Sequence, residues 1–231
     1  ISGAILILYA QTLSKTVPDA VGHMISASLI VLPASILIAR LMVPGDGATQ
    51  MDPGDTDLKY ESSIDAVITG TMDGVQLFLA VIGIIIVVFA LVALFDQILA
   101  VLPLIDGSPL TLRRFFGWIF APLMWAIGIP WEDAGTAGGL MGTKAILNEY
   151  VAYLDMAALP DGELGPRSKL IITYALCGFA NLASVGLLVS TIGTLCPARR
   201  TDAASLGMKS WVAGNLASAM TGAMIGLVTA V

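Results

Sequence analysis

Long stretches of this sequence, of more than twenty residues, carry no charged side chain. Residues 170–198 and 210–231 contain no Asp, Glu, Lys or Arg. Because lipid cannot hydrogen-bond to backbone groups, apolar stretches of about 20 residues are typical of helices that cross a membrane. The composition agrees, since charged residues make up 12% of the chain but about 25% of a typical soluble domain. We therefore predict an all-α polytopic membrane protein.

Five segments are expected to form transmembrane helices or parts of them: Ile1–Ser14, Val21–Val43, Leu77–Leu104, Leu170–Ala198 and Ser210–Val231. Between the second and third of these, Pro44–Asp73 is polar and acidic, which favours a solvated loop with a surface helix. The chain starts with Ile and enters an apolar stretch at once, without the charged region of a signal peptide. We expect a further N-terminal part to precede it.

The charge and the reactive residues exclude several classes of function. A net charge of −6 argues against nucleic acid as a partner, since phosphate binding needs clustered Lys and Arg. Two cysteines and one histidine are too few for a disulfide framework or a Cys/His metal site. The sequence has no Gly-x-Ser-x-Gly elbow and no phosphate-binding loop. We predict no enzyme activity, no metal and no organic cofactor.

Two segments between the third and fourth spans are unsuited to crossing a bilayer. Thr111–Ile127 starts with two arginines and three aromatic residues, which favours a helix at the membrane interface. Asp133–Met156 alternates glycines with polar residues, and neither half can cross about 30 Å of hydrocarbon. Two half-length helices that meet at a polar tip, a re-entrant hairpin, fit this pattern.

The fourth span has small and polar residues at its centre. As one helix its 29 residues would extend about 43 Å, which exceeds the hydrocarbon thickness. Gly178 and Gly186 flank Asn181 and Ser184. The helix therefore either unwinds here and turns polar groups inward, or packs its small residues against a neighbouring helix. Composition alone leaves both readings open.

Glu149 is the most informative residue of the expected hairpin. An ionised side chain inside a membrane costs on the order of several kcal/mol without a partner, and such residues are usually functional. Glu149 is expected to bind hydroxyls of a polar solute, to accept a coupling proton, or to pair with Lys144. Lys144 lies five residues earlier, outside the spacing at which side chains meet on a helix.

Four further residues complete a set that suits a sugar. Asn148 and Asn181 offer donors and acceptors, and Ser184 adds a hydroxyl three residues after Asn181, on the same helical face. Phe179 offers a ring that packs on a flat apolar surface. These residues and Glu149 predict a site for a hydroxylated ligand.

Two long motifs occupy the expected hairpin and the fourth span. Residues 142–153 read GTKAILNEYVAY, and residues 177–186 read CGFANLASVG. The first resembles the signature G-x-K-x-x-x-N-E-F-V-A-Y of the concentrative nucleoside transporters, with Tyr150 in place of Phe. The second resembles the segment C-G-F-A-N-F-S-S-I-G of the same family, with differences that include Leu182 and Ala183. The resemblance covers essentially the whole chain.

The resemblance implies a trimeric carrier with two re-entrant hairpins and two unwound helices, arranged as inverted repeats around a site at mid-membrane. It identifies Asp133–Met156 as the second hairpin and Leu170–Ala198 as the second broken helix. Glu149 would then hydrogen-bond to ribose hydroxyls, Asn181 and Ser184 would add contacts to the sugar, and Phe179 would lie beside the nucleoside.

The resemblance also places part of a cation site at the start of the chain. Residues 1–10, ISGAILILYA, are similar to the first broken helix of the family. The serine expected to help bind sodium falls on Ala4, so only the backbone carbonyls of Ala4 and Ile5 are left to bind a cation. For this reason we favour a proton over sodium as the coupling ion.

These expectations divide the chain into three parts. Residues 1–110 hold the end of the first broken helix and scaffold spans, 111–198 form the substrate-binding half, and 199–231 hold the last span. The expected function is nucleoside import across the plasma or bacterial inner membrane. Alternatives are a carrier for nucleobases or other hydroxylated heterocycles, and a membrane subunit of the same fold that transports nothing. An intramembrane enzyme would need a titratable partner for Glu149, and only Lys144 and Asp155 lie near it in sequence.

Overall fold

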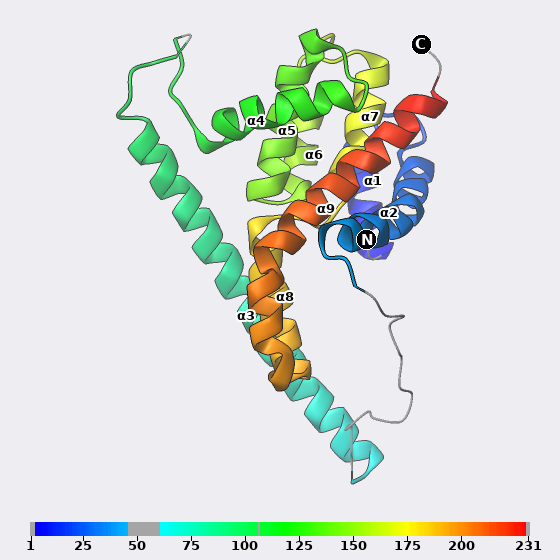
Figure 1. Cartoon of the computed structure of the whole chain (residues 1–231), viewed down its shortest axis with the longest axis vertical. Helices are drawn as coiled ribbons and strands as arrows, with labels where there is room; N and C mark the ends of the chain where they lie inside the picture. The colour runs from blue at the N-terminus through cyan, green and yellow to red at the C-terminus, as the bar shows by residue number, and fades with distance from the viewer. Residues whose placement is uncertain (1–2, 46–60, 106, 230–231) are drawn as a thin grey trace.

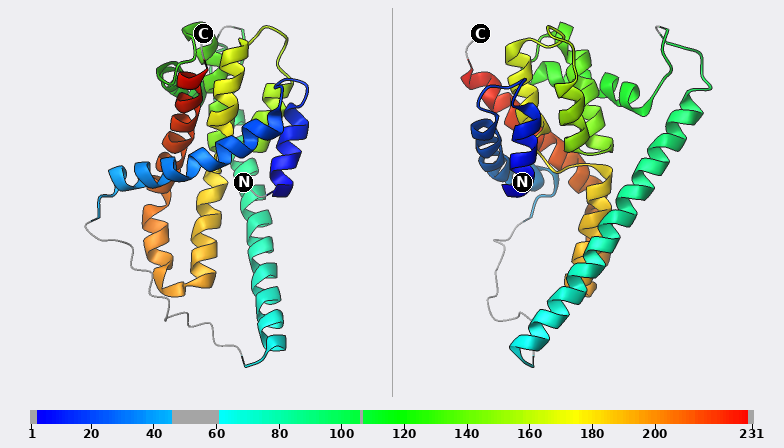
Figure 2. Two further views of the ribbon diagram at one scale, coloured as in Figure 1. Left: turned by 90° about the vertical axis from the view of Figure 1, so that its right-hand side faces the viewer. Right: turned by 180° about the vertical axis from the view of Figure 1, so that it is seen from behind.

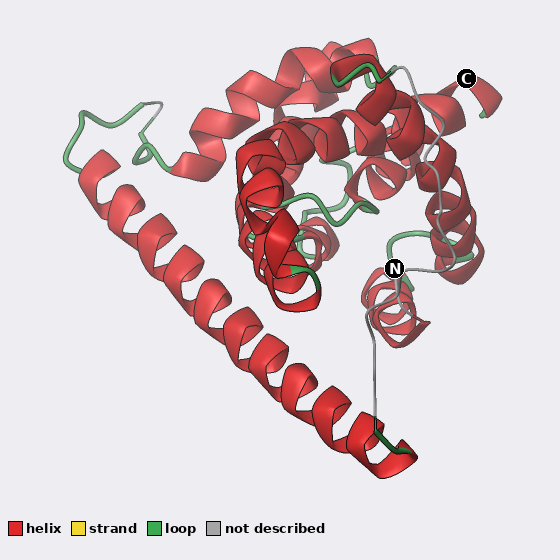
Figure 3. Ribbon diagram, turned by 60° about the horizontal axis from the view of Figure 1, so that its bottom comes forward, coloured by secondary structure: helices red, strands yellow, loops and turns green. Residues whose placement is uncertain are grey.

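The computed structural model describes residues 3–45, 61–105 and 107–229, apart from the side chains of Ala4 and Val81. Within these ranges the regular structure is helical (Figures 1 and 3). The helices are α1 (Gly3–Leu13), α2 (Ala20–Met42), α3 (Ser63–Leu99), α4 (Leu112–Ala126), α5 (Trp131–Ile146), α6 (Glu149–Ala157), α7 (Pro166–Leu176), α8 (Leu182–Leu195), a short 3₁₀ helix (Pro197–Arg199) and α9 (Arg200–Val228). Much of the acidic segment 44–73 lies outside the described residues.

Three described helices are long and apolar enough to cross a membrane: α2, α3 and the segment Pro197–Val228. They expose many large apolar side chains, as in Leu29, Leu32 and Phe78, each more than 60% accessible. Water does not tolerate such long apolar surfaces, whereas lipid does. The protein is therefore an integral membrane protein with an all-α fold, as predicted.

Two helices start earlier than the sequence suggested. α3 begins at Ser63, not Leu77, because the Ser62 hydroxyl accepts a hydrogen bond from the backbone N–H of Asp65 and caps the helix. α9 begins at Arg200, not Ser210, and its first turn is supported by the ion pair between Arg199 and Asp202 (2.9 Å). In both cases charged residues in the first turns concealed a helix that continues into the apolar span.

The helices are arranged in two groups (Figure 2). α8 lies between α3 and the first half of α9 at one end of the molecule, while α1, α4, α5, α6 and α7 gather at the other end. The buried apolar core lies in this second group and includes Leu13, Met124, Leu140 and Tyr153. The hairpin formed by α5 and α6 is thus enclosed by protein.

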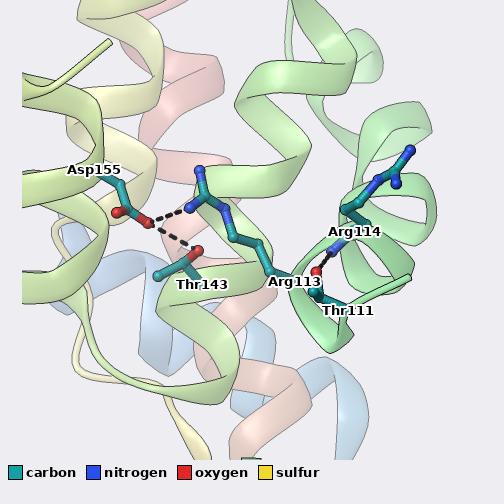
Figure 4. A network of polar contacts seen from close by, with 5 residues as sticks. All are labelled: Thr111, Arg113, Arg114, Thr143 and Asp155. Carbon is teal, nitrogen blue, oxygen red and sulfur yellow. Dashed lines mark hydrogen bonds and ion pairs between the residues drawn. The ribbon is translucent and has the colours of Figure 1, made fainter. Parts of the chain in front are cut away.

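Helix α4 packs on α5 and is held there by polar contacts as well. Gly117, Phe120, Ala121 and Met124 form its buried face. In a helix at the interface, arginines of the first turn commonly reach lipid headgroups; here Arg113 forms an ion pair with Asp155 of α6 (3.0 Å), which also accepts a bond from Thr143 (Figure 4). Arg113 therefore links α4 to α6, while about half of its side chain stays accessible.

The second arginine of α4 is also bound by protein. Arg114 donates to three carbonyls of the preceding loop, those of Ile105, Ser108 and Pro109. Asp96, near the end of α3, accepts a bond from the Leu112 N–H (2.7 Å). These bonds fix the connection between α3 and α4.

Candidate functional site

The polar tip of the hairpin lies between α5 and α6. α5 ends at Ile146 and α6 begins at Glu149, so Leu147 and Asn148 make the turn. The Asn148 side chain accepts a hydrogen bond from the Val151 N–H (2.9 Å) and caps α6. The expected pair of half-length helices is therefore present as a helical hairpin, with Glu149 as the first residue of its second arm.

The fourth expected span is broken at its centre. α7 ends at Leu176 and α8 begins at Leu182, so residues 177–181 form a non-helical connection. Asn181 caps α8 in a reciprocal arrangement: its side chain accepts from the Ser184 N–H (2.7 Å), and the Ser184 hydroxyl accepts from the Asn181 N–H (3.0 Å). Of the two readings left open, the structure therefore has the unwound helix.

Glu149 joins three segments that are far apart in the sequence. Its Oε1 accepts a hydrogen bond from the Tyr9 hydroxyl of α1 (2.9 Å), and its Oε2 accepts one from Asn181 Nδ2 (3.3 Å). The Glu149 side chain is 3% accessible and Asn181 is 1% accessible. The hairpin tip, the break and α1 thus meet at one buried carboxylate.

The electrostatics at this point suit an anion. Glu149 occupies the first turn of α6, where unpaired backbone N–H groups and the helix dipole stabilise negative charge. It receives no direct help from Lys144, whose ammonium bonds to Asn215 and Ser218 of α9 instead. The pairing with Lys144 considered from the sequence is therefore absent from the described contacts.

A small cavity opens beside these groups. It measures about 60 Å³ and is lined by Asn148 of the tip, by Phe179, Asn181 and Ser184 of the break and α8, and by apolar side chains of α3 that include Ile84 and Phe89. Phe179 is 60% accessible, so its ring projects from the break rather than filling the core. Four of the five predicted substrate-binding residues line this cavity, and the fifth, Glu149, contacts Asn181.

The two residues predicted to bind a cation lie elsewhere, in the first turns of α1. Their carbonyls are positioned for hydrogen bonds within the helix, so Ala4 and Ile5 do not form an unwound segment here. The side chain of Ala4 lies outside the described residues, and that of Ile5 is 39% accessible. The cation site stays a prediction.

Tyr9 is a site residue that the sequence reasoning missed. It lies on an otherwise apolar stretch, and its only signal was a hydroxyl in a segment expected to be near mid-membrane. Its ring stacks on Tyr150 (5.9 Å between centroids) and packs against Tyr153 (5.0 Å). This stacking aims the hydroxyl at Glu149.

Removing this hydroxyl is expected to weaken binding of the nucleoside that the family resemblance implies as ligand. In Tyr9→Phe the carboxylate loses a donor that helps to fix its orientation, and hydrogen bonds to charged groups contribute about 1.5–3 kcal/mol. We expect the affinity for that ligand to be about tenfold lower, measured by equilibrium binding to the purified complete protein. Tyr150→Phe removes a hydroxyl from the neighbouring ring but leaves the bond to Glu149, and serves as control. Equal affinities of the two variants would contradict this role of Tyr9.

Comparison with known proteins identifies the family. Residues 23–226 match the family described as the C-terminus of Na⁺ dependent nucleoside transporters. The chain belongs to this family. The nucleoside permease NupC of Helicobacter pylori is 32% identical over 232 residues, which cover 98% of this chain and 54% of the relative. The chain spans about half the length of the curated relatives it matches.

Solved structures show the same fold. The structure of CNTnw in an inward-facing substrate-bound state is 38% identical, with a TM-score of 0.74, and the match covers 98% of this chain and 54% of that one. A variant of CNTnw in an outward-facing state is 37% identical, with a TM-score of 0.84 and coverages of 100% and 55%. The family resemblance predicted from the two motifs is thereby confirmed. This nucleoside transporter family is named for an ion and not for an organic cofactor or an enzyme activity.

Proposed function

We propose that the chain forms the nucleoside-binding half of a transporter that imports nucleosides with a coupling cation. The observation that carries the proposal is the buried carboxylate of Glu149, held by Tyr9 and Asn181 beside a cavity at the tip of the hairpin. Glu149, Asn148, Asn181 and Ser184 contact the ribose, and Phe179 packs on the nucleoside.

The chemistry of Glu149 fits a ribose. An ionised carboxylate offers about four acceptor positions, and Tyr9 and Asn181 use two of them. The remaining two match the paired 2′ and 3′ hydroxyls of a ribose, which are donors that need acceptors. Asn148 and Asn181 also present the starts of two capped helices, α6 and α8, toward the same space. The unpaired backbone N–H groups at a helix start are donors that can bond to the oxygen atoms of a sugar.

Transport requires the binding elements to move relative to α3. The cavity of about 60 Å³ is well below the ~300–1,000 Å³ of typical ligand pockets. α3 side chains close it, and Ile84 lies over Gly186 of α8 at 3.2 Å from the position of a Cβ there. We infer that α3 belongs to a scaffold, past which the hairpin and the broken helix move when a nucleoside enters.

The coupling cation is proposed to be a proton. Ala4 stands where a hydroxyl would support sodium, and α1 keeps the carbonyls of Ala4 and Ile5 in helical positions. Glu149, by contrast, is a buried carboxylate with only uncharged partners among the described residues. Such a group is suited to exchange a proton as the surrounding elements move.

Uptake into proteoliposomes under separately imposed gradients tests both parts of the proposal. The complete transporter is expected to accumulate radiolabelled uridine or adenosine several-fold above equilibrium under an inward proton gradient, and not under a sodium gradient alone. Stimulation of uptake by a sodium gradient alone would overturn the proposal that the coupling ion is a proton. If neither gradient drives concentrative uptake, the result would favour the alternative hypothesis, a membrane subunit that has the same fold but transports nothing.

Substrate class is tested in the same assay. If ribose hydroxyls are the recognised groups, unlabelled ribosides compete for uptake and free nucleobases do not. Competition by free bases would favour the carrier for nucleobases instead. The remaining expectations are part of the proposal: a homotrimer in the plasma or bacterial inner membrane, with residues 111–198 as the substrate-binding half and a hairpin that is re-entrant.

A further inference from the structure

Lys144 is a lysine sealed inside the protein. It is 0% accessible and lies in the last turn of α5. Its ammonium donates to Asn215 Oδ1 and Ser218 Oγ of α9, each at 3.1 Å. The ion pairs among the described residues are Arg113–Asp155 and Arg199–Asp202, so the partners of Lys144 are uncharged. Burying an ammonium without a carboxylate is costly, which requires a site built to hold it.

The two acceptors on α9 are fixed by their own hydrogen bonds. Asn215 Nδ2 donates to the carbonyls of Ala180 (3.1 Å) and Trp211 (2.9 Å), which leaves Oδ1 facing the ammonium. Ser218 donates its proton to the Gly214 carbonyl (2.8 Å), which leaves its lone pairs to accept from Lys144. Each donor thus has an acceptor, and the two α9 side chains form a binding site for the ammonium of Lys144.

This site touches the break between α7 and α8. A Cβ added to Gly178 would overlap Ser218 Oγ and lie 3.8 Å from Lys144 Nζ, so the backbone of the break runs directly against the ammonium. α7 ends two residues earlier, at Leu176, and the C-terminal end of a helix carries partial negative charge that stabilises a cation. A second contact between α9 and the break is the hydrogen bond from Asn215 Nδ2 to the Ala180 carbonyl.

The same face of α9 also holds the hairpin. Trp211 donates from Nε1 to the Ala145 carbonyl (2.9 Å), next to Lys144. Trp211, Asn215 and Ser218 are spaced four and three residues apart, so they share one helical face. The break is therefore bonded on one side to Asn215, which also accepts from the Lys144 ammonium, and on the other side Asn181 bonds to Glu149. The two charges face opposite sides of the break without touching.

We propose that Lys144 of the hairpin places a fixed positive charge beside the break between α7 and α8, and that it is a positioning residue of the ribose site. By fixing Asn215 and Ser218, its ammonium holds residues 178–180 against α9, and this sets Asn181 at the distance from Glu149 at which both bond to ribose hydroxyls. The inference rests on the proposed function, since it assigns Lys144 an effect on the sugar contacts and not on the rest of the ligand.

Lys144→Met tests this role, because methionine keeps much of the length and loses the charge. Binding is measured with the purified complete transporter for uridine and for 2′,3′-dideoxyuridine, which lacks the 2′ and 3′ hydroxyls. The affinity for uridine is expected to fall at least tenfold, while that for dideoxyuridine changes less than twofold. Lys209→Met, an exposed lysine of the same helix α9, is the matched control and should leave both affinities unchanged.

The outcomes separate the hypotheses. Equal losses for both ligands would show that Lys144 only supports the fold, and unchanged affinities would show that it does not position the site. Unmutated protein that binds the two ligands equally would overturn the ribose site itself, independently of Lys144.

A second variant covers the case in which Lys144→Met does not fold. Lys144→Ala leaves a space of the size of n-propylammonium, which is expected to restore uridine binding. The uncharged 1-propanol has a similar size and should not restore it. Rescue by both compounds, or by neither, would contradict a role for the charge.

Discussion

Replacing Glu149 with glutamine is expected to reduce nucleoside uptake by about 100-fold or more. The amide is nearly the same size, but it replaces one acceptor oxygen with a donor NH₂ that faces Tyr9, Asn181 or the ligand, all of which donate to this group. Hydrogen bonds to charged groups contribute about 1.5–3 kcal/mol each, and two lost ribose bonds therefore exceed the ~2.8 kcal/mol that corresponds to 100-fold. Initial uptake rates in proteoliposomes measure the effect.

Glu132→Gln is the matched control for this substitution. Glu132 is exposed in the first turn of α5, on the other arm of the same hairpin, and is not among the residues that line the cavity. Its uptake is expected to stay within about twofold of the unmutated protein. If Glu149→Gln transports uridine at a rate close to that of Glu132→Gln, Glu149 does not bind the substrate.

The ligand offers an independent check on the same interaction. For 2′,3′-dideoxyuridine, which has no hydroxyls for the carboxylate, the affinities of the unmutated protein and of Glu149→Gln should differ by less than about threefold. A loss as large as that for uridine would mean that the substitution disrupts the hairpin rather than a sugar contact.

The sequence predicted the elements of this site better than their contacts. The hairpin and the break could be anticipated because glycines and polar residues interrupt apolar stretches that are otherwise long enough to span a membrane. Asn148 and Asn181 could be singled out as polar groups in apolar surroundings. Asn148 and Asn181 are also the N-caps of α6 and α8. This second role became visible only when the structure showed where the two helices begin.

Contacts between distant segments could not be predicted. Tyr9 is 140 residues from Glu149 and Lys144 is 71 residues from Asn215, and no local pattern encodes such pairs. Spacing correctly argued against a helical pair between Lys144 and Glu149, but it gave no sign of the two acceptors on α9. The start of α3 was placed 14 residues too late for a different reason: its first turns carry Asp65 and Asp73, so hydropathy alone placed the start of the span after them.

The close contact between α4 and α5 makes Gly138 a position where one methyl group should be decisive. A Cβ at Gly138 would come within 2.8 Å of the Ala121 nitrogen and nearer still to the Gly117 carbonyl oxygen, and real Cβ atoms essentially never come that close to other atoms. Both neighbours are backbone atoms of α4, so no side chain can rotate away and the two helices must separate. Overpacking costs typically 1–3 kcal/mol and occasionally more, and we expect Gly138→Ala to lose about 3 kcal/mol or more.

Thermal unfolding of the purified transporter in detergent measures this loss, and the same helix provides the control. Gly135 lies three residues earlier in α5, and a Cβ there would meet nothing within 4 Å. Because alanine is favoured over glycine in a helix by about 1 kcal/mol, Gly135→Ala should unfold at the same or a higher temperature than the unmutated protein, and Gly138→Ala at a clearly lower one. Since α4 holds the first arm of the hairpin, Gly138→Ala should also weaken nucleoside binding in the fraction that stays folded. Equal unfolding temperatures for the two alanine variants would show that α4 and α5 do not pack this closely.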